Sequence, residues 1–404
     1  MIFMLTVVID TIVSFIVFPL TSEQMGAIDG EGYAKLATTM LDCGKFAFNC
    51  DVGSTVFRGP GYPAFLALIN LPFGAVQYEW SVIVQILINA ASAVLVYKVA
   101  QRLYNERTAR IAVLLFLCMP LLHVFIPRFH LENLLMFLLL GIVSLLARDV
   151  EALRVRHLVG AALLIGYAIL VKQTILLLPV LLSFLLLYRG VRRSRVMIIL
   201  FIPYLIVLPW SIRSSALAES VVPVHVNAGM NVVIGNSVVR NFWQSPYEGK
   251  QLWWEGMKEC RKIVPEANRY TAVLESNEDR LLLAAGLKDM LTPEFIFRKL
   301  STNLLLLFSL GSSPLNSAMI GLPWLLVLPF SLIGLRKHRA MFHSNSLILS
   351  IAFYLILLHL PIYSIGRFAI PFAPLLLLPA AAALQGFASS IMLRSARSKD
   401  IANC

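Results

Sequence analysis

Acidic, aromatic and basic side chains occur together in the polar loop that separates the first two hydrophobic stretches of the sequence. The loop contains IDGEGYAKLATTM followed by FRGPGYPAFLA, which includes Asp29, Glu31, Tyr33, Arg58 and Tyr62. Charged side chains are costly to hold beside lipid unless they bind something polar. A carboxylate and a guanidinium at a membrane surface suit chemistry on a charged lipid headgroup, so this loop is the first candidate for a functional site.

The elements that position this loop must be membrane helices. Hydrophobic residues make up 58% of the 404 positions and charged residues only 14%, which excludes an ordinary soluble domain. Apolar runs of about 18 residues or more recur along the chain, and that length crosses a hydrocarbon core. Backbone polar groups in lipid need internal partners, and the alternation typical of barrel strands is missing, so the runs must be helical. The fold class expected is an all-α polytopic integral membrane protein.

About ten transmembrane helices are expected. The predicted spans cover residues 1–20, 80–101, 109–127, 131–147, 157–171, 173–188, 196–212, 317–335, 345–361 and 369–391. Segment 299–311 is too short to span comfortably, so we expect an interfacial or re-entrant helix there. The first span lacks a basic start and a clear small-residue cleavage site, so it is interpreted as an anchor and not as a removed signal peptide.

The net charge of +12 reflects membrane topology and not nucleic-acid binding. Half of the 34 basic residues form five clusters in short loops and the C-terminal tail. The clusters are Lys98, Arg102, Arg107 and Arg110; Arg148, Arg154 and Arg156; Arg189, Arg192, Arg193 and Arg195; Arg336, Lys337 and Arg339; and Arg394, Arg397 and Lys399. By the positive-inside rule, these segments and both termini are cytoplasmic. Residues 28–63 and about 213–298 then lie on the opposite, external face.

The chain is divided into three regions on this topology. Residues 1–212 form a transmembrane catalytic unit that includes a first external loop at 21–79. Residues 213–298 form an external segment, in which 271–291 have the apolar spacing of an amphipathic surface helix. Residues 299–404 contain the interfacial helix and the C-terminal transmembrane helices.

Three further residues raise questions that the sequence leaves open. Cys43 and Cys50 both lie on the external side, where they either form a disulfide or remain free thiols. No cysteine spacing suggests a zinc site. Asp10 lies inside the first span, where a carboxylate needs a partner or a proton, and it is interpreted as a helix-packing contact.

Six short motifs follow one another along nearly the whole chain. They are D-G-E-G-Y-x-x-L-A at 29–37, R-G-P-G-Y-P at 58–63, L-E-N-L at 131–134, L-P-W-S-I-R at 208–213, N-A-G-M-N-V-V-I-G-N at 227–236 and G-R-F-A-I-P at 366–371. This series resembles the GT-C superfamily of glycosyltransferases, in particular the family 39-like branch related to protein O-mannosyltransferases and aminoarabinose transferases. The resemblance implies a GT-C-like fold with external juxtamembrane helices.

The resemblance also implies an activity. Such enzymes transfer a sugar from a polyprenyl-phosphate-linked donor to a glycan, lipid or protein acceptor on the non-cytoplasmic face, with inversion. The departing lipid phosphate needs cationic stabilisation, and the acceptor hydroxyl needs a base. Membrane lipids are partners, nucleic acid is not, no cofactor is certain and a divalent metal is left open. A multi-pass protein of a bacterial plasma (inner) membrane is expected, with the site on the external, periplasmic face.

Two acids are the candidates for catalysis. Asp29 matches the family's acidic residue at the start of the first external loop, so the resemblance implies a general base there. Its alternative is an N-cap, because Asp29 precedes a plausible helix and Asp is favoured at that position. Glu31 departs from the small or polar residue expected, and it is a second acid, an acceptor contact or a solvated side chain.

Three cations are the candidates for binding the donor phosphate. Arg58 precedes a stiff G-P-G-Y-P turn and could bind a phosphate bidentately, or simply extend to the interface. Lys172 lies between two spans, where a lone cation is costly, and its alternative is an ion pair with Glu132. Arg367 matches the family's arginine before the final span and either binds phosphate or pairs with an acid.

The remaining candidates are assigned to substrate binding, and no residue is assigned as a metal ligand. The substrate-binding candidates are Tyr33, Tyr62, Arg128, Glu132, Asn231 and Asn236. The main alternative function is a transporter or flippase for a lipid-linked or hydrophilic solute. Paired repeat halves and matched broken helices, which such folds often have, are not visible in the sequence. A third reading is a non-catalytic assembly protein.

Overall fold

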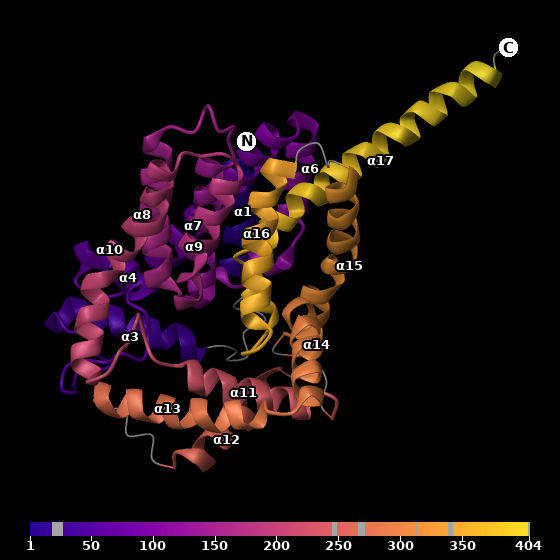
Figure 1. Cartoon of the computed structure of the whole chain (residues 1–404). Helices are drawn as coiled ribbons and strands as arrows, with labels where there is room; N and C mark the ends of the chain where they lie inside the picture. The colour runs from indigo at the N-terminus through magenta and orange to yellow at the C-terminus, as the bar shows by residue number, and fades with distance from the viewer. Residues whose placement is uncertain (18–26, 245–248, 266–270, 312, 338–341, 403–404) are drawn as a thin grey trace.

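The computed structural model describes residues 1–17, 27–244, 249–265, 271–311, 313–337 and 342–402. All regular structure within these ranges is helical (Figure 1). The expected all-α class is therefore confirmed.

Each of the ten predicted spans overlaps one α-helix. These helices are α1 (Ile2–Ile12), α5 (Tyr78–Leu103), α6 (Glu106–Leu117), α7 (Leu131–Leu146), α8 (Val155–Val171), α9 (Leu178–Tyr188), α10 (Arg193–Ala218), α15 (Pro314–Lys337), α16 (Phe342–His359) and α17 (Ala373–Ala402). In the described part of the chain, α5, α10 and α15 are long and apolar enough to cross a membrane by themselves. The other apolar helices are shorter, so the count of ten remains a prediction.

The span expected at 109–127 is bent. After α6 the chain continues into two 3₁₀ turns, η3 (Pro120–Leu122) and η4 (Ile126–Arg128), and the two parts meet at 76°. Each turn contains a proline, which removes a backbone donor and disfavours a continuous helix. His123 contacts the carbonyl oxygen of Phe116 through Nε2 at 3.1 Å, so the break gains a side-chain partner.

Asp10 has the partner that a carboxylate inside a span requires. Its Oδ1 lies 2.5 Å from Nδ1 of His123, and its Oδ2 accepts a hydrogen bond from Asn89 at 2.9 Å. The contact joins α1 to α5 and to the bent segment, which agrees with the packing role predicted for Asp10.

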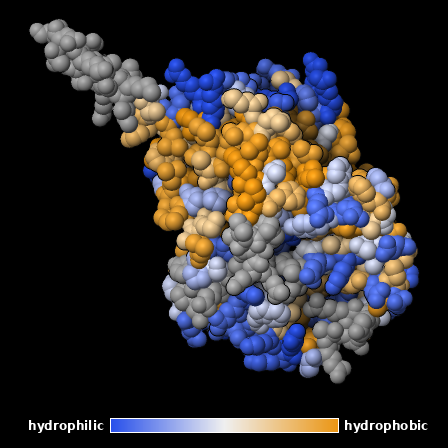
Figure 2. Space-filling model, turned by 180° about the vertical axis from the view of Figure 1, so that it is seen from behind, coloured by the Kyte–Doolittle hydropathy of each residue, from blue (hydrophilic) through white to orange (hydrophobic). Residues whose placement is uncertain are grey.

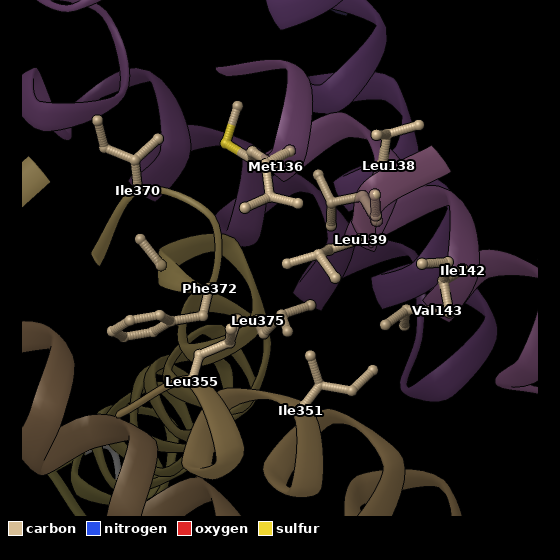
Figure 3. Close-up of a cluster of buried hydrophobic side chains, with 14 of the residues drawn as sticks. Met136, Leu138, Leu139, Ile142, Val143, Ile351, Leu355, Ile370, Phe372 and Leu375 are labelled. Carbon is tan, nitrogen blue, oxygen red and sulfur yellow. The ribbon is translucent and has the colours of Figure 1, made fainter. Parts of the chain in front are cut away.

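The apolar core lies around α7. Met136 and Leu139 on this helix face Ile351 and Leu355 of α16 and Phe372 just before α17 (Figure 3). Almost every residue of α7 is buried, whereas α10 and α15 expose leucines along their outer sides. Because α7 is packed on nearly all sides, the surrounding core holds both of its ends in place.

The remaining helices are placed at one end of this bundle. They are α3 (Ala27–Cys43), α4 (Gly61–Asn70) with the 3₁₀ turn η2 (Leu71–Phe73), α11 (Ala228–Asn241), α12 (Gly249–Ile263), α13 (Ala272–Asp289) and α14 (Pro293–Ser309). In Figure 1, α11, α12 and α13 lie across the lower end of the bundle, and both chain termini are at the upper end. We call α11, α12 and α13 the cap of the bundle, and the side of the membrane on which it lies remains a prediction.

Two local predictions about this cap need adjustment. The amphipathic helix expected at 271–291 exists as α13, but polar and apolar residues are separated far more clearly on α12. The short helix expected at 299–311 is α14, which begins at Pro293. Proline at the first helical position explains the earlier start, because its fixed φ suits that place.

A hydrophobic band crosses the upper half of the face seen in Figure 2, between hydrophilic residues above and a larger, mostly hydrophilic region below. The exposed apolar side chains of the protein include Phe201 and Leu205 of α10 and Leu325 of α15. Contiguous exposed apolar surface of this extent is typical of lipid contact.

Candidate functional site

Glu132 is the centre of a buried cluster of charges at the N-terminal end of α7. Its Oε1 lies 3.9 Å from Nζ of Lys172, the first residue after α8, and 3.9 Å from Nε of Arg367 in the 3₁₀ turn η7 (Gly366–Ala369). The carboxylate is buried, so both cations face it in a region of low polarity. The ion pair offered as an alternative for Lys172 is thus present.

Aromatic and imidazole rings line the same cluster. Lys172 Nζ lies 4.2 Å and Arg367 Cζ 5.6 Å from the centre of the Phe368 ring, within cation–π range. The other side of Arg367 contacts His130, whose ring nitrogens lie 3.3 Å from a guanidinium nitrogen. His130 is buried, as expected of a structural histidine.

Arg58 joins the cluster from the first external loop. Its guanidinium carbon lies 5.1 Å from the centre of the Tyr33 ring and 5.2 Å from that of Phe57. Tyr33 in turn meets Tyr62 edge to face at 5.2 Å, and the Tyr62 hydroxyl donates to Oε1 of Gln85 at 2.8 Å. Both tyrosines are buried, so they hold Arg58 in place, and their direct contact with substrate remains a prediction.

The two glycines of the R-G-P-G motif bring Arg58 close to Lys172. A Cβ on Gly59 would lie 2.7 Å from the Leu170 carbonyl oxygen, and one on Gly61 would lie 2.5 Å from the Val171 nitrogen. The loop therefore packs directly on the last residues of α8, immediately before Lys172. Only glycine permits so close an approach of two backbones.

Asp29 lies on the helix that borders this cluster. It is the third residue of α3 as described, so it lies within the helix and is not its N-cap. The next residue, Gly30, packs on the Arg128 carbonyl group, and Tyr33 lies one turn further along. The Asp29 side chain lies outside the described residues, so its catalytic role remains a prediction.

The second acid of this loop points elsewhere. Glu31 is exposed on α3, whereas Tyr33 two residues later is buried. Within the described ranges no ion pair joins Glu31 to a cation of the cluster. Its catalytic assignment remains a prediction without a contact that supports it.

Comparison with known proteins places this arrangement in context. A model of the dolichyl-phosphate-mannose-protein mannosyltransferase family matches residues 58–212, which include Arg58, Arg128, Glu132 and Lys172. No curated protein matches the chain as a relative.

Solved structures resemble nearly the whole chain. The apo oligosaccharyltransferase of Archaeoglobus fulgidus superposes with a TM-score of 0.58 at 15% identity, over 99% of this chain and 52% of that one. The same enzyme with an inhibitory peptide and a dolichol-phosphate gives 0.57 at 15% identity, over 99% and 51%. The chain has the GT-C fold.

The likeness covers only part of the matched proteins. The chain spans about half the length of the oligosaccharyltransferase. ArnT from Cupriavidus metallidurans, solved with undecaprenyl phosphate, is a weaker match, with a TM-score of 0.44 and 14% identity over 94% of this chain and 76% of that one.

The cap helix α13 holds the Arg58 loop from the other side. Glu275 of α13 is buried, and it accepts hydrogen bonds from the Thr55 hydroxyl at 2.6 Å and the Val56 N–H at 2.7 Å. The Val226 N–H donates to the Val56 carbonyl at 2.9 Å. Sequence reasoning missed Glu275, because nothing in the local pattern links it to a loop about 220 residues away.

The L-P-W-S-I-R motif also has a positioning role. Arg213, its last residue, lies with its guanidinium carbon 4.4 Å from the Trp210 ring centre and 5.5 Å from that of Phe46. Phe46 belongs to the loop after α3, which a disulfide between Cys43 and Cys50 closes. The pairing that the sequence left open is therefore present.

The predicted substrate residues fall into two groups. Arg128, next to the cluster, has its guanidinium carbon 5.3 Å from the Phe125 ring centre. The Asn231 side chain donates to Oδ1 of Asn227, at the start of α11, at 3.3 Å. Asn236 is buried, with its amide donating to the Gly286 carbonyl at 2.9 Å. Substrate contacts by either asparagine remain predictions, and the structure does not bring Asn236 to the cluster.

Lys299 of α14 is the cation beside Asn236. It is buried, and its Nζ donates to Oδ1 of Asn236. Burial, with Arg240 adding to it and Asp289 opposing it, lowers the pKa of Lys299 to about 7. This lysine therefore links α14 to α11.

The residues present offer a limited ligand set for a metal. No group of three His, Cys, Asp or Glu side chains converges in the part of the chain that the structure describes. One structure of the related oligosaccharyltransferase is a complex with Zn and sulfate. The Asp29 side chain lies outside the described residues, so the absence of such a group does not extend to it.

Proposed function

We propose that this chain is an integral-membrane glycosyltransferase that moves a sugar from a polyprenyl-phosphate-linked donor to an acceptor on the external face. The observation that carries the proposal is that Lys172 and Arg367, from separate elements, share the carboxylate of Glu132, while the Arg58 loop packs on the residues just before Lys172. Three cations and one anion leave this site with positive charge, which suits a lipid phosphate.

The reaction follows from these groups. The acceptor oxygen attacks the anomeric carbon and gives its proton to Asp29. The bond between that carbon and the phosphate oxygen breaks, and its electron pair stays on the phosphate. The added charge is stabilised by Arg58, Lys172 and Arg367, which stand ready before the reaction begins. Attack from the side opposite the phosphate inverts the anomeric configuration.

The setting of the site supports this proposal. The related oligosaccharyltransferase binds a dolichol-phosphate and a peptide within the same fold. The disulfide of Cys43 and Cys50 belongs to the Arg58 loop, and disulfides persist in oxidising compartments. Both point to donor binding on the external face of a plasma membrane. The acceptor is a glycan, a lipid or a protein.

Asp29→Asn in the purified protein tests the reaction. With a polyprenyl-phosphate-linked sugar as donor, turnover should fall by about 10²–10⁴-fold, because a positioned base supplies that factor. Asp42→Asn is the control, because Asp42 is exposed on the same helix. Near wild-type turnover of Asp29→Asn would remove this base. Movement of the lipid-linked sugar across vesicles without transfer would favour the flippase.

A further inference from the structure

His225 lies between the two loops that supply Arg58 and Lys172. It belongs to the connection between α10 and α11, and its backbone N–H donates to Oε1 of Gln173, which follows Lys172, at 3.0 Å. On its other side, a Cβ on Gly59, which follows Arg58, would lie 3.3 Å from Cδ2 of the imidazole. The ring is thus placed where the loop of the first external segment meets the end of α8.

The imidazole has one nitrogen that the protein leaves unsatisfied. Nδ1 of His225 is buried, and it has no hydrogen-bond partner among the described residues. A buried polar atom without a partner costs about 1–3 kcal/mol, so such atoms call for an explanation. The charged groups that act on the ring are Arg58 and Lys172. Both are cations, and neither can accept a hydrogen bond from it.

We propose that His225 is a fourth ligand of the donor phosphate, in addition to Arg58, Lys172 and Arg367. The assignment rests on the proposed function, because it needs a phosphate at this place. Nδ1–H would donate to a phosphate oxygen. When the sugar leaves, that phosphate changes from a singly charged diester to a doubly charged monoester, and the hydrogen bond strengthens.

The electrostatic state of the ring agrees with this role. Burial, with the neighbouring Arg58 and Lys172 acting in the same direction, lowers the pKa of His225 to about 3. The imidazole is therefore neutral before the donor binds, and it adds no repulsion between the two cations. A bound phosphate has the opposite effect on the ring, so the released lipid phosphate should bind more tightly as the pH falls.

Binding of undecaprenyl phosphate to the full-length purified protein tests the assignment. His225→Phe should weaken binding about tenfold to hundredfold, the worth of one hydrogen bond to a charged group. His225→Gln keeps an N–H donor and should lose less. His157→Gln is the matched control, because His157 lies in the first turn of α8 and bonds only the Arg154 backbone. Its affinity should equal that of the wild type.

The outcomes separate this inference from the proposed function. Wild-type affinity of His225→Phe, while Arg58→Ala loses binding, would overturn the ligand and keep the phosphate site. Absence of binding by the wild-type protein would overturn both. If His225→Phe does not fold, His225→Ala replaces it in the same binding measurement. It also lacks the N–H donor and should lose the same factor, and wild-type affinity of this variant would refute the assignment.

Discussion

The two ends of α7 both gather basic side chains, but their neighbours differ. At the C-terminal end, Arg189 donates to the carbonyl oxygens of Leu146 at 3.2 Å and Arg148 at 2.6 Å. Arg102 donates to the Ser144 carbonyl at 2.7 Å. The last carbonyls of a helix carry partial negative charge and have no partner within the helix, so these arginines complete it.

The N-terminal end of the same helix has the opposite character. There the cations meet one shared carboxylate, Glu132, and the faces of aromatic rings such as Phe368. Its sixteen residues separate the two ends by about 24 Å. The comparison teaches that neighbours, and not residue type, decide whether a buried cation caps a helix or attracts an anion.

A pair of substitutions should break the comparison most strongly. Lys172→Met should lower transfer per folded molecule by about 10²-fold or more, because it removes charge where the phosphate leaves. Arg189→Met should leave transfer per folded molecule unchanged and lower stability by about 2 kcal/mol, because it frees two carbonyls. Turnover and thermal unfolding of both variants check this. Equal losses of activity would erase the distinction between the two ends.

Removal of the shared carboxylate sharpens the contrast. Glu132→Gln should destabilise the protein by about 3 kcal/mol, since it leaves buried cations without their anion. Added undecaprenyl phosphate should recover part of this loss. Glu106→Gln at the other face breaks an exposed pair with Arg110 and should cost under about 1 kcal/mol. Unfolding curves with and without the lipid measure both variants. If the lipid does not raise the stability of Glu132→Gln, the cations around Glu132 do not bind its phosphate.

Loss of the contacts between Glu275 and the Arg58 loop should have a smaller effect on activity. Glu275→Gln cannot accept both hydrogen bonds as a carboxylate does, so Thr55 and Val56 should shift and the apparent donor KM should rise about tenfold. Among the described residues Glu259, partly exposed on α12, is paired only with Lys262 on the same helix, so Glu259→Gln is the control and should behave as wild type. An unchanged donor KM for Glu275→Gln would show that the loop holds Arg58 without the cap.

The smallest effect concerns a buried lysine away from the cluster. The pKa of Lys299 is about 7 in the folded protein and about 10.4 in an unfolded chain. Between these values the unfolded chain binds more protons, so stability should rise with pH across this window. Lys299→Met should flatten the rise. Melting temperatures at pH 6, 7.5 and 9 measure it, and identical slopes would contradict the burial effect.

Part of the site could be predicted because its signals are local. The R-G-P-G motif, the Lys172 between two apolar runs and the G-R-F motif each attracted notice by chemistry alone, and the structure brings their cations together. His225 and Glu275 gave no such signal. Their roles depend on contacts with residues about 50 and 220 positions away, which no spacing rule describes.

The same division holds for the fold. Apolar length determined that the chain forms membrane helices, because hydrophobic burial and backbone hydrogen bonding are satisfied within each segment. The basic clusters determined which ends lie together. Tertiary structure alone decided the bend after α6, the packing of Gly59 on α8 and the sharing of Glu132 by two cations. These features arise from the meeting of distant segments, where close packing and electrostatics select one arrangement among the many that local preferences allow.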